Sequence, residues 1–221
     1  MDISKQYDAV GKTYISQQKQ FFNGRKDRAT IAMQKLLQNI RGKIILDIGC
    51  GSGRDILLYE SLGAKECWGI DTSRFMVKEA KNNIKHPGRV MVSNIEKTPF
   101  KNRQFDILTG RFSMHYLKKL DKAYKEMARI LRPKGVLVIA VDHPIREILE
   151  KKKSYHTSEI LTVGLYHGKV DLKFPSHTMD EYFSPTFFRY FYLDGFLEDR
   201  DYEIYTPKMT ADFMTLRAVR R

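Results

Sequence analysis

Residues 46–53 read Leu46-Asp47-Ile48-Gly49-Cys50-Gly51-Ser52-Gly53. They complete an apolar, β-branched run over 43–48, and the run stops at the first glycine, as is typical of a buried parallel strand. Glycines after a strand allow positive φ angles and let a ligand approach bare backbone. A helix that starts there offers unpaired N–H groups. The stretch therefore predicts a strand, a ligand-binding turn and a helix.

The chain on either side of this turn alternates between strands and helices. Further apolar runs predict strands at 67–70, 90–92, 105–109 and 136–141, and helical segments lie at about 53–62, 73–84 and 119–131. Near the end of the chain we expect a helix at about 184–194 that ends at Gly195, and strands near 201–206 and 212–219. Such alternation predicts an α/β fold with a doubly wound, mostly parallel, seven-stranded sheet covered on both faces.

Two regions do not follow this alternation. The first forty residues are predicted to be helical, with one face buried and with Gly42 ending the second helix; the residues of that face are Ile31, Met33, Leu36, Leu37 and Ile40. Residues 145–183 contain an amphipathic piece and a predicted hairpin around His167-Gly168. We interpret 145–183 as an insertion over the carboxyl edge of the sheet.

These segments together predict one domain over residues 1–221. Its parts are an N-terminal helical lid (1–42), a cofactor-binding core (43–142), a substrate cap after the fifth strand (145–183) and a C-terminal helix with strands (184–221). A chain of this length buries roughly 70% of its unfolded surface and needs no disulfide. A monomer or a homodimer is expected.

Composition narrows the setting and the partners. The two cysteines form no C-x-x-C pair and lie near no histidine cluster, so we expect no metal site and a reduced, cytoplasmic location. We find no signal peptide and no run approaching the roughly 18 apolar residues of a membrane span. The net charge is +13, which raises the prospect of a nucleic-acid partner. The excess lies in the first two thirds, because residues 143–221 hold twelve bases and twelve acids.

Two acids accompany the glycine turn. Asp47 lies inside the first strand, where a carboxylate disfavours a pyrophosphate and suits a positively charged ligand end. Asp71 ends the second strand, eighteen residues beyond Gly53, where a ribose-binding acid belongs in this kind of fold. Its two oxygens can accept from both ribose hydroxyls; the plainer role is to cap the helix that begins near Ser73. The G-x-G-x-G spacing differs from the G-x-G-x-x-G of dinucleotide-binding dehydrogenases.

The turn and its acids resemble those of the class I S-adenosylmethionine-dependent methyltransferases, in their small single-domain branch with a Rossmann-like fold. Further matching segments are 93–100 after the third strand, 105–117 around the fourth and the turn 129–135 before the fifth. The resemblance covers about 7–142 well and 177–221 loosely. It implies S-adenosyl-L-methionine as the cofactor and S-adenosyl-L-homocysteine as the product.

The resemblance also implies which residues contact the cofactor. In the family, the glycine turn binds the methionine part of the cofactor, the residue matching Asp71 binds the ribose, and the residues matching Asn94 and Ile95 bind the adenine. The family often has aspartate at the position of Asn94. Tyr7 and Tyr14 resemble an aromatic lid, although both also suit ordinary helix packing. The expected set is Tyr7, Tyr14, Asp47, Gly49, Cys50, Gly51, Gly53, Asp71, Thr72, Asn94, Ile95, Glu96 and Arg111.

Methyl transfer needs alignment more than it needs a particular catalytic group. His115 follows the fourth strand and His143 follows the fifth, so both are expected at the edge where the methyl group is presented. Each is a candidate general base; His115 equally suits packing, and His143 suits a turn that stops its strand before Pro144. His177 is a weaker candidate for the acceptor pocket.

Four functions compete. A methyltransferase acting on a small molecule is favoured by the aromatic, charge-neutral insertion. An RNA methyltransferase, for instance on a tRNA base, is favoured by the net charge of +13, but we find no appended RNA-binding module and no dense basic stripe. A subunit that binds the cofactor without turnover is disfavoured by the intact glycines and Asp71. A dehydrogenase is disfavoured by the glycine spacing. No membrane partner is expected.

Overall fold

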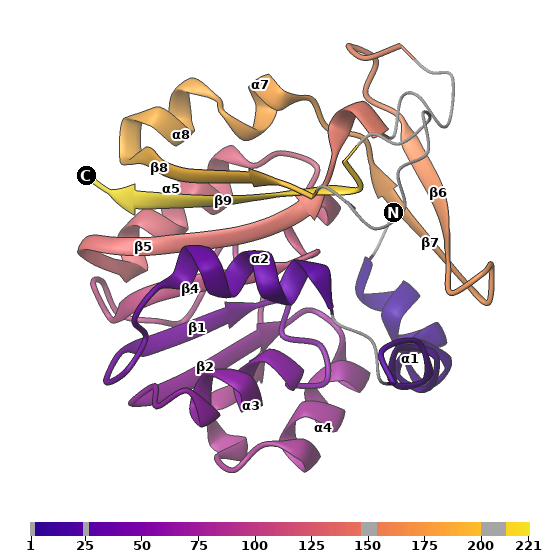
Figure 1. The fold of residues 1–221 in the computed structure, drawn as a ribbon, viewed down its shortest axis with the longest axis horizontal. Coiled ribbons are helices and arrows are strands. Elements are labelled where there is room, and N and C mark those ends of the chain that lie inside the picture. The colour runs from indigo at the N-terminus through magenta and orange to yellow at the C-terminus, as the bar shows by residue number, and fades with distance from the viewer. Residues whose placement is uncertain (1–2, 24–26, 147–153, 200–210) are drawn as a thin grey trace.

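The computed structural model describes residues 3–23, 27–146, 154–199 and 211–221. Seven strands form the main sheet, and their bounds are β1 Ile44–Ile48, β2 Glu66–Asp71, β3 Val90–Val92, β4 Phe105–Arg111, β5 Leu131–Asp142, β8 Phe191–Glu198 and β9 Phe213–Arg220. The described α-helices are α1 Ile3–Phe21, α2 Arg28–Leu37, α3 Arg54–Ser61, α4 Arg74–Asn83, α5 Asp121–Ile130, α7 Met179–Tyr182 and α8 Pro185–Tyr190. The expected α/β fold is confirmed (Figure 1).

The strand order across the sheet is β3-β2-β1-β4-β5-β9-β8. Strands β1 to β5 run parallel to their neighbours, whereas β9 is antiparallel to both β5 and β8. The order reverses between β1 and β4, and in open α/β sheets a ligand crevice forms outside the carboxyl ends of the strands at such a point. The glycine turn follows β1 and therefore lies at this crevice.

Helices cover both faces of the sheet because every central strand is apolar on both sides. Alternate residues of β5 show this directly: Leu137 and Ile139 pack among the side chains of α5 and α8, and Val138 and Ala140 pack among those of α2, α3 and α4. The two buried clusters hold the strands in register and fix the positions of their carboxyl ends.

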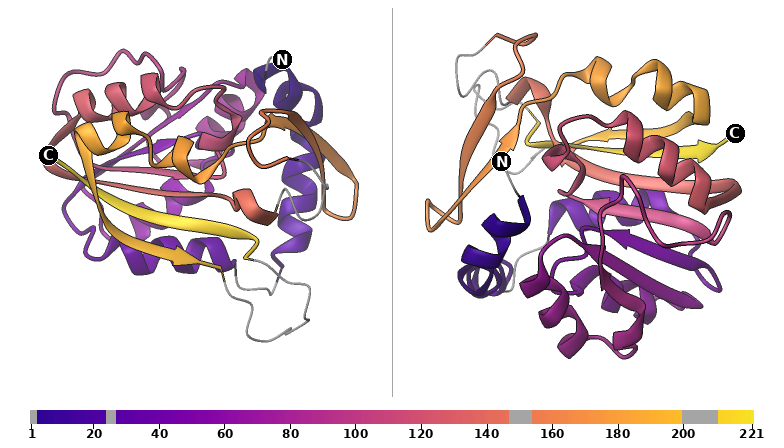
Figure 2. Two further views of the ribbon diagram at one scale, coloured as in Figure 1. Left: turned by 90° about the horizontal axis from the view of Figure 1, so that it is seen from above. Right: turned by 180° about the vertical axis from the view of Figure 1, so that it is seen from behind.

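Helix α1 belongs to neither layer. It lies across the carboxyl ends of the strands, beside a separate hairpin formed by β6 (Ile160–Leu165) and β7 (Val170–Pro175), as Figures 1 and 2 both show. The predicted hairpin is confirmed; Tyr166, His167 and Gly168 turn it with positive φ angles. Its inner face is apolar, and Leu161, Leu172 and Phe174 are buried.

Two predicted helix ends are wrong. Helix α2 ends at Leu37, because Gln38 adopts φ 55° and turns the chain four residues before Gly42. The C-terminal helix stops at Tyr190, and Gly195 lies inside β8, where the pairing shifts between Leu193 and Gly195. The aromatic run at 191–196 pairs with β9, and this sheet pairing overrides the helical pattern.

Two further strand predictions have different outcomes. The strand predicted near 201–206 lies outside the described residues, and the one predicted at 212–219 is β9. The fifth strand is longer than the predicted 136–141: β5 begins at Leu131 and includes the turn at Pro133. Among the described helices, none combines the length and the apolar character needed to cross a membrane.

Candidate active site

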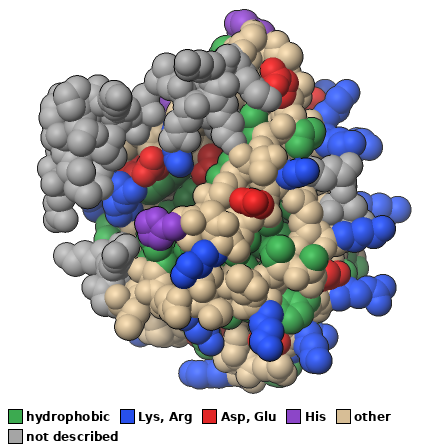
Figure 3. Space-filling view, turned by 90° about the vertical axis from the view of Figure 1, so that its right-hand side faces the viewer, with side chains coloured by type: hydrophobic (Ala, Val, Ile, Leu, Met, Phe, Trp, Pro, Cys, Tyr) green, Lys and Arg blue, Asp and Glu red, His purple; other side chains and the backbone are tan. Residues whose placement is uncertain are grey.

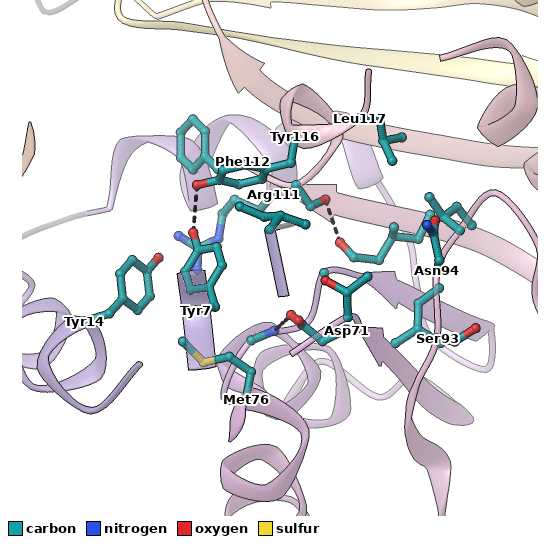
Figure 4. A pocket seen from close by; sticks show the side chains of 18 residues that line it. Tyr7, Tyr14, Asp71, Met76, Ser93, Asn94, Arg111, Phe112, Tyr116 and Leu117 are labelled. Atoms are coloured by element: carbon teal, nitrogen blue, oxygen red, sulfur yellow. Dashed lines mark hydrogen bonds between the residues drawn. The ribbon is translucent and has the colours of Figure 1, made fainter. Parts of the chain in front are cut away.

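A cavity of about 790 Å³, including its open mouth, lies at the carboxyl ends of β1, β2 and β4 (Figure 4). The residues that line it are Ile3, Tyr7, Tyr14, Ile48, Gly49, Gly51, Ile70, Asp71, Thr72, Met76, Ser93, Asn94, Ile95, Arg111, Phe112, Ser113, Tyr116 and Leu117. They come from five separate segments that only the fold brings together.

Asp71 joins the glycine turn to the second strand. One of its carboxylate oxygens accepts from the Gly51 amide at 2.9 Å, and the other accepts from the Ser73 amide at 2.9 Å. Ser73, rather than Asp71, caps α4, since its Oγ accepts from the Met76 amide at 3.1 Å. Burial raises the pKa of Asp71, and the backbone amides of Ser73 and Gly51 oppose that shift. Each oxygen keeps a second lone pair for a hydroxyl donor.

The glycines of the turn serve two different purposes. Gly49 and Gly51 both have positive φ, at 69° and 52°. A Cβ on Gly49 would lie 2.4 Å from the Ser113 Cβ, whereas a Cβ on Gly51 would meet no protein atom within 4 Å. Gly49 is therefore needed for packing, and Gly51 faces the cavity. Ser113 itself is fixed by a 2.7 Å hydrogen bond to the Ile48 carbonyl.

The segment after β3 forms one wall of the cavity. Ile95 is buried and lines the cavity together with Ser93 and Asn94. The side-chain oxygen of Asn94 accepts from the Glu96 amide at 2.9 Å, which fixes the amide group at the cavity wall. Glu96 does not line the cavity. This wall presents an apolar face and an amide, groups that suit a heteroaromatic ring.

Tyrosines from the N-terminal helix close the opposite side. Tyr7 and Tyr14 project from α1 into the cavity, and their rings meet edge to face with centroids 5.4 Å apart. The Tyr7 hydroxyl lies 2.8 Å from that of Tyr116, which follows β4 (Figure 4). Burial raises the pKa of all three phenols, so they are neutral at physiological pH.

Two further contacts hold α1 over the cavity. The Asp8 carboxylate accepts from the Ser73 hydroxyl at 2.5 Å and from the Phe75 amide at 3.0 Å, at the start of α4. The Gln6 side chain exchanges two hydrogen bonds with the backbone of Lys173 in β7, at 3.1 and 2.8 Å. The N-terminal helix is thus attached both to the start of α4 and to the hairpin.

Comparisons with known proteins agree with this geometry. A protein-family model described as "Methyltransferase domain" matches residues 46–139. The chain is 33% identical over 141 residues to an uncharacterised protein of Methanocaldococcus jannaschii, covering 64% of this chain and 52% of that protein. It is 26% identical over 129 residues to a ubiquinone/menaquinone biosynthesis C-methyltransferase of Burkholderia vietnamiensis, covering 56% and 53%. The chain spans between 40% and 52% of the length of three curated relatives.

Solved structures share the fold. An S-adenosylmethionine-dependent methyltransferase from Mesorhizobium loti superposes with a TM-score of 0.74 at 19% identity, covering 88% of this chain and 98% of that one. A complex of the Haloferax volcanii Trm112 methyltransferase activator with a methyltransferase gives a TM-score of 0.73 at 16% identity, covering 99% and 97%. Residues 46–139 thus match a methyltransferase domain, and the fold is that of solved S-adenosylmethionine-dependent methyltransferases.

The residues of the cavity fit the cofactor of these methyltransferases. Asp71 offers a paired acceptor of the kind that a ribose diol needs, and Ile95 offers an apolar surface of the kind that an adenine ring needs. Nine of the residues expected from the sequence line the cavity together: Tyr7, Tyr14, Gly49, Gly51, Asp71, Thr72, Asn94, Ile95 and Arg111. When bound, S-adenosylmethionine supplies an electrophilic methyl group on its sulfonium.

Four other predicted residues lie behind the cavity wall. Asp47, Cys50, Gly53 and Glu96 do not line it. Asp47 is buried in β1, where its carboxylate accepts from the Thr109 hydroxyl at 3.0 Å. Burial raises the pKa of Asp47, and the neighbouring Asp55 adds to the shift. Gly53 begins α3 with φ 84°, and a Cβ there would meet Ile84 at 2.8 Å. Asp47 and Gly53 therefore support the glycine turn from outside the cavity.

The predicted histidines lie near the site without lining the cavity. His115 is 2% exposed and packs its ring 4.3 Å from Tyr116 and 4.6 Å from Phe174. Burial lowers the pKa of His115 to about 3, so it is neutral and only weakly basic at neutral pH. His143 is buried at the end of β5, where its Nε2 lies 3.0 Å from Glu198 in β8.

His177 is also buried, and its position explains how the hairpin region is held. Its Nε2 lies 2.8 Å from the Leu117 carbonyl and its Nδ1 lies 2.9 Å from Glu181. It therefore connects the loop after β4 to α7. Within the described ranges, no group of three or more His, Cys, Asp or Glu side chains is placed to hold a metal ion.

Sequence reasoning missed several cavity residues. Phe112, Ser113 and Tyr116 line the cavity and lie in the matched segment 105–117, but none of them was predicted to contact the cofactor, and Met76 lies outside every matched segment. Phe112 adopts φ 53°, which is uncommon for a bulky residue, and its ring lies 5.7 Å from that of Phe213. Tyr116 directly follows His115, and of these two residues only His115 was predicted to act at the site. No signal in the sequence indicates the backbone conformation of Phe112.

Proposed function

We propose that this protein transfers the methyl group of S-adenosylmethionine to a small-molecule acceptor, by in-line displacement at the sulfonium. The observation that carries the proposal is the covered cavity at the switch point of the sheet, lined by Asp71, the glycine turn and the tyrosines of α1. In this proposal residues 1–42 act as the lid, 43–142 bind the cofactor and 145–183 cover the acceptor.

The cover over the cavity supports a compact acceptor. Helix α1 closes one side, and the hairpin packs against it through Tyr14 and Tyr166, whose ring centroids lie 5.7 Å apart. The contacts between α1 and the hairpin are thus aromatic, and such side chains would exclude water from the sulfonium of the bound cofactor. On the face seen in Figure 3, hydrophobic side chains and a few acidic ones are scattered over the centre, and Lys and Arg side chains stand as separate groups, many along the edge.

The chain's own residues would act by binding and alignment, since alignment can lower a barrier by about 7–11 kcal/mol. Asp71 would hold the ribose, Asn94 and Ile95 the adenine, and the neutral phenols of Tyr7 and Tyr116 would face the reacting centre. His115 and His143 stay predictions as general bases. The low pKa of His115, about 3, favours a positioning role behind Tyr116.

An RNA substrate is the second candidate. The net charge of +13 favours it, as does the similar fold of a methyltransferase that assembles with the activator Trm112. The relatives named for quinone and sterol methylation support a small apolar acceptor instead. The two candidates differ in salt dependence, because contacts to a phosphate backbone weaken steeply with added salt.

The deciding experiment is a transfer assay with methyl-labelled S-adenosylmethionine. The protein is incubated separately with a fractionated small-molecule extract and with total RNA, at two salt concentrations. We expect label in an extractable small molecule, with little dependence on salt. Label in RNA, lost at the higher salt, would instead establish the second candidate. Cofactor binding without transfer to either fraction would contradict both.

A further inference from the structure

His115 carries a buried ring nitrogen that has no hydrogen-bond partner. Among the described residues, none forms a hydrogen bond with its Nδ1 atom, although the side chain is buried. Native proteins pair nearly all of their buried polar atoms, and the exceptions include groups with a catalytic role. The carboxylate of Asp142, at the end of β5, lies nearby. Its Oδ2 is 3.9 Å from the Nδ1 of His115, which is beyond hydrogen-bond distance.

The proton of the His115 ring belongs on Nδ1. Burial lowers the pKa of His115 to about 3, so the imidazole is neutral at neutral pH, and one of its nitrogens is a donor while the other is an acceptor. A carboxylate oxygen 3.9 Å away attracts an N–H group and repels a lone pair, which favours the tautomer with the proton on Nδ1. His115 and Asp142 thus offer one donor and one acceptor close together.

A hydroxyl group satisfies both partners at once. An oxygen atom about 2.8 Å from both Nδ1 and Oδ2 would bind them at an angle of about 90°, which a hydroxyl oxygen can adopt. It accepts from His115 with one lone pair, donates to Asp142, and keeps its second lone pair for attack on a methyl group. An ammonium group has no lone pair to offer. A neutral amine has one, which cannot accept from His115 and attack at the same time.

Aromatic rings connect this pair to the cavity. The ring centroid of His115 lies 4.3 Å from that of Tyr116 and 4.6 Å from that of Phe174 in β7, and the ring of Phe112 lies 6.4 Å away by the same measure. Tyr116 and Phe112 line the cavity, and Phe174 belongs to the hairpin beside α1. The Asp142 side chain is 23% exposed, so a ligand can reach its carboxylate. The pair therefore lies next to the cavity, in aromatic surroundings.

We infer that His115 and Asp142 bind the hydroxyl group of the methyl acceptor, a small compound with that hydroxyl on an apolar or aromatic frame. Asp142 acts as the base, and the N–H of His115 orients the acceptor oxygen. This oxygen forms its bond to the methyl carbon while the carbon–sulfur bond breaks. The electron pair of the broken bond stays on the sulfur, and the hydroxyl proton goes to Asp142. The inference rests on the proposed function and adds the class of the acceptor and the atom that is methylated.

The position of the methyl group in the product is the first test. The protein is incubated with methyl-labelled S-adenosylmethionine and a fractionated small-molecule extract, and mass spectrometry identifies the labelled product. We expect a methyl ether. Label on nitrogen, sulfur or carbon would overturn the inference and leave the proposed function intact. A reaction that labels no small molecule would overturn the proposed function, and the inference with it.

Two variants test the residues themselves, with the extract fraction that contains the acceptor as the substrate. Asp142→Asn keeps the shape of the side chain but removes the base, and we expect kcat to fall at least about hundredfold. His115→Phe keeps the packing but removes the N–H group, and the KM for that fraction should rise about tenfold, with a smaller change in kcat. Both variants should bind S-adenosylhomocysteine within about twofold of the wild type. The matched control is Asp121→Asn, at the start of α5 and outside the cavity lining, which should keep the wild-type rate.

An Asp142→Asn protein with the wild-type kcat would overturn the inference. An equal loss of activity and of affinity for S-adenosylhomocysteine would also overturn it, because it would show that Asp142 has only a structural role. If a variant does not fold, the position of the methyl group in the wild-type product decides the question.

Discussion

The hydroxyl oxygens of Tyr7 and Tyr116 lie 2.8 Å apart, although 109 residues separate them in sequence. Tyr7 comes from the N-terminal helix and Tyr116 from the loop after β4, so this hydrogen bond joins α1 to the loop at the edge of the cavity. Because this hydrogen bond is partly buried, removal of either hydroxyl leaves the other without this partner.

We therefore expect Tyr7→Phe and Tyr116→Phe each to speed dissociation of S-adenosylhomocysteine about fivefold, which corresponds to about 1 kcal/mol for one hydrogen bond. The double variant should cost no more than either single variant, since both remove the same interaction. Stopped-flow displacement measures the rates. Tyr190→Phe, outside the cavity, serves as the control, and additive effects in the double variant would show that the two hydroxyls act separately.

The glycine turn offers a paired prediction. Gly49→Ala and Gly51→Ala carry a similar strain of roughly 1–2 kcal/mol for the left-handed conformation, but only the former meets Ser113. We expect Gly49→Ala to lower the melting temperature markedly and Gly51→Ala to lower it little. Gly51→Ala should nevertheless weaken S-adenosylmethionine binding, because its methyl group enters the cavity. Calorimetric melting and titration check the pair; a Gly51→Ala protein with normal affinity would contradict the assignment.

Asp71→Asn should weaken binding of S-adenosylmethionine by about 1.5–3 kcal/mol, the usual cost of losing a hydrogen bond to a charged group. The amide keeps one acceptor oxygen but offers an N–H group to either Gly51 or Ser73, whose amides both donate to Asp71. Titration calorimetry gives the affinity. Glu79→Gln on α4 removes a carboxylate that does not line the cavity, and its affinity should match the wild type. Equal affinities for Asp71→Asn and the wild type would remove Asp71 from the ribose site.

Stability should fall in acid in a way that traces to His115. Burial lowers its pKa to about 3, against about 6.5 in an unfolded chain, so the unfolded state binds the proton more readily. The contribution is complete above pH 6.5 and is lost as the pH falls toward 3, by about 1.4 kcal/mol per unit. His115→Phe should therefore lose about 2 kcal/mol less than the wild type between pH 6.5 and 5.

Urea unfolding at the two pH values measures this difference. His86→Gln is the control, because His86 is exposed and its substitution should leave the pH dependence unchanged. The carboxylates contribute equally to all three proteins, so the comparison isolates the buried histidine. Parallel stability curves for His115→Phe and the wild type would show that His115 is protonated without cost in the folded protein.

Loss of a contact between α1 and the β6–β7 hairpin should speed hydrogen exchange in both segments. Gln6→Ala removes both hydrogen bonds to the Lys173 backbone, and we expect faster amide hydrogen exchange in α1 and at the edge of β7. Gln17→Ala on the same helix, for which no contact to the hairpin is seen, is the control. Unchanged exchange in Gln6→Ala would mean that the aromatic contact between Tyr14 and Tyr166 holds the two segments without it.

Most of the fold could be predicted from local sequence. The apolar runs that become the central strands β1, β4 and β5 are buried on both faces, so their composition identifies them without any knowledge of their neighbours. The predicted end of the C-terminal helix was wrong, because strand pairing with β9 decides the secondary structure there. Gly195 resembles a helix end, but β9 offers hydrogen bonds to the chain around it, and that chain becomes β8.

The sequence by itself determined the glycine turn, Asp71 and the order of strands and helices, because each depends on residues close together in the chain. Only the tertiary structure decided which side chains meet at the cavity. Arg111 reaches partners 56 and 84 residues away, and Tyr7 reaches one 109 residues away. Such pairs leave no periodic or spacing signal. They form only because the carboxyl ends of the strands, fixed by the packed core, bring distant segments to one edge of the sheet.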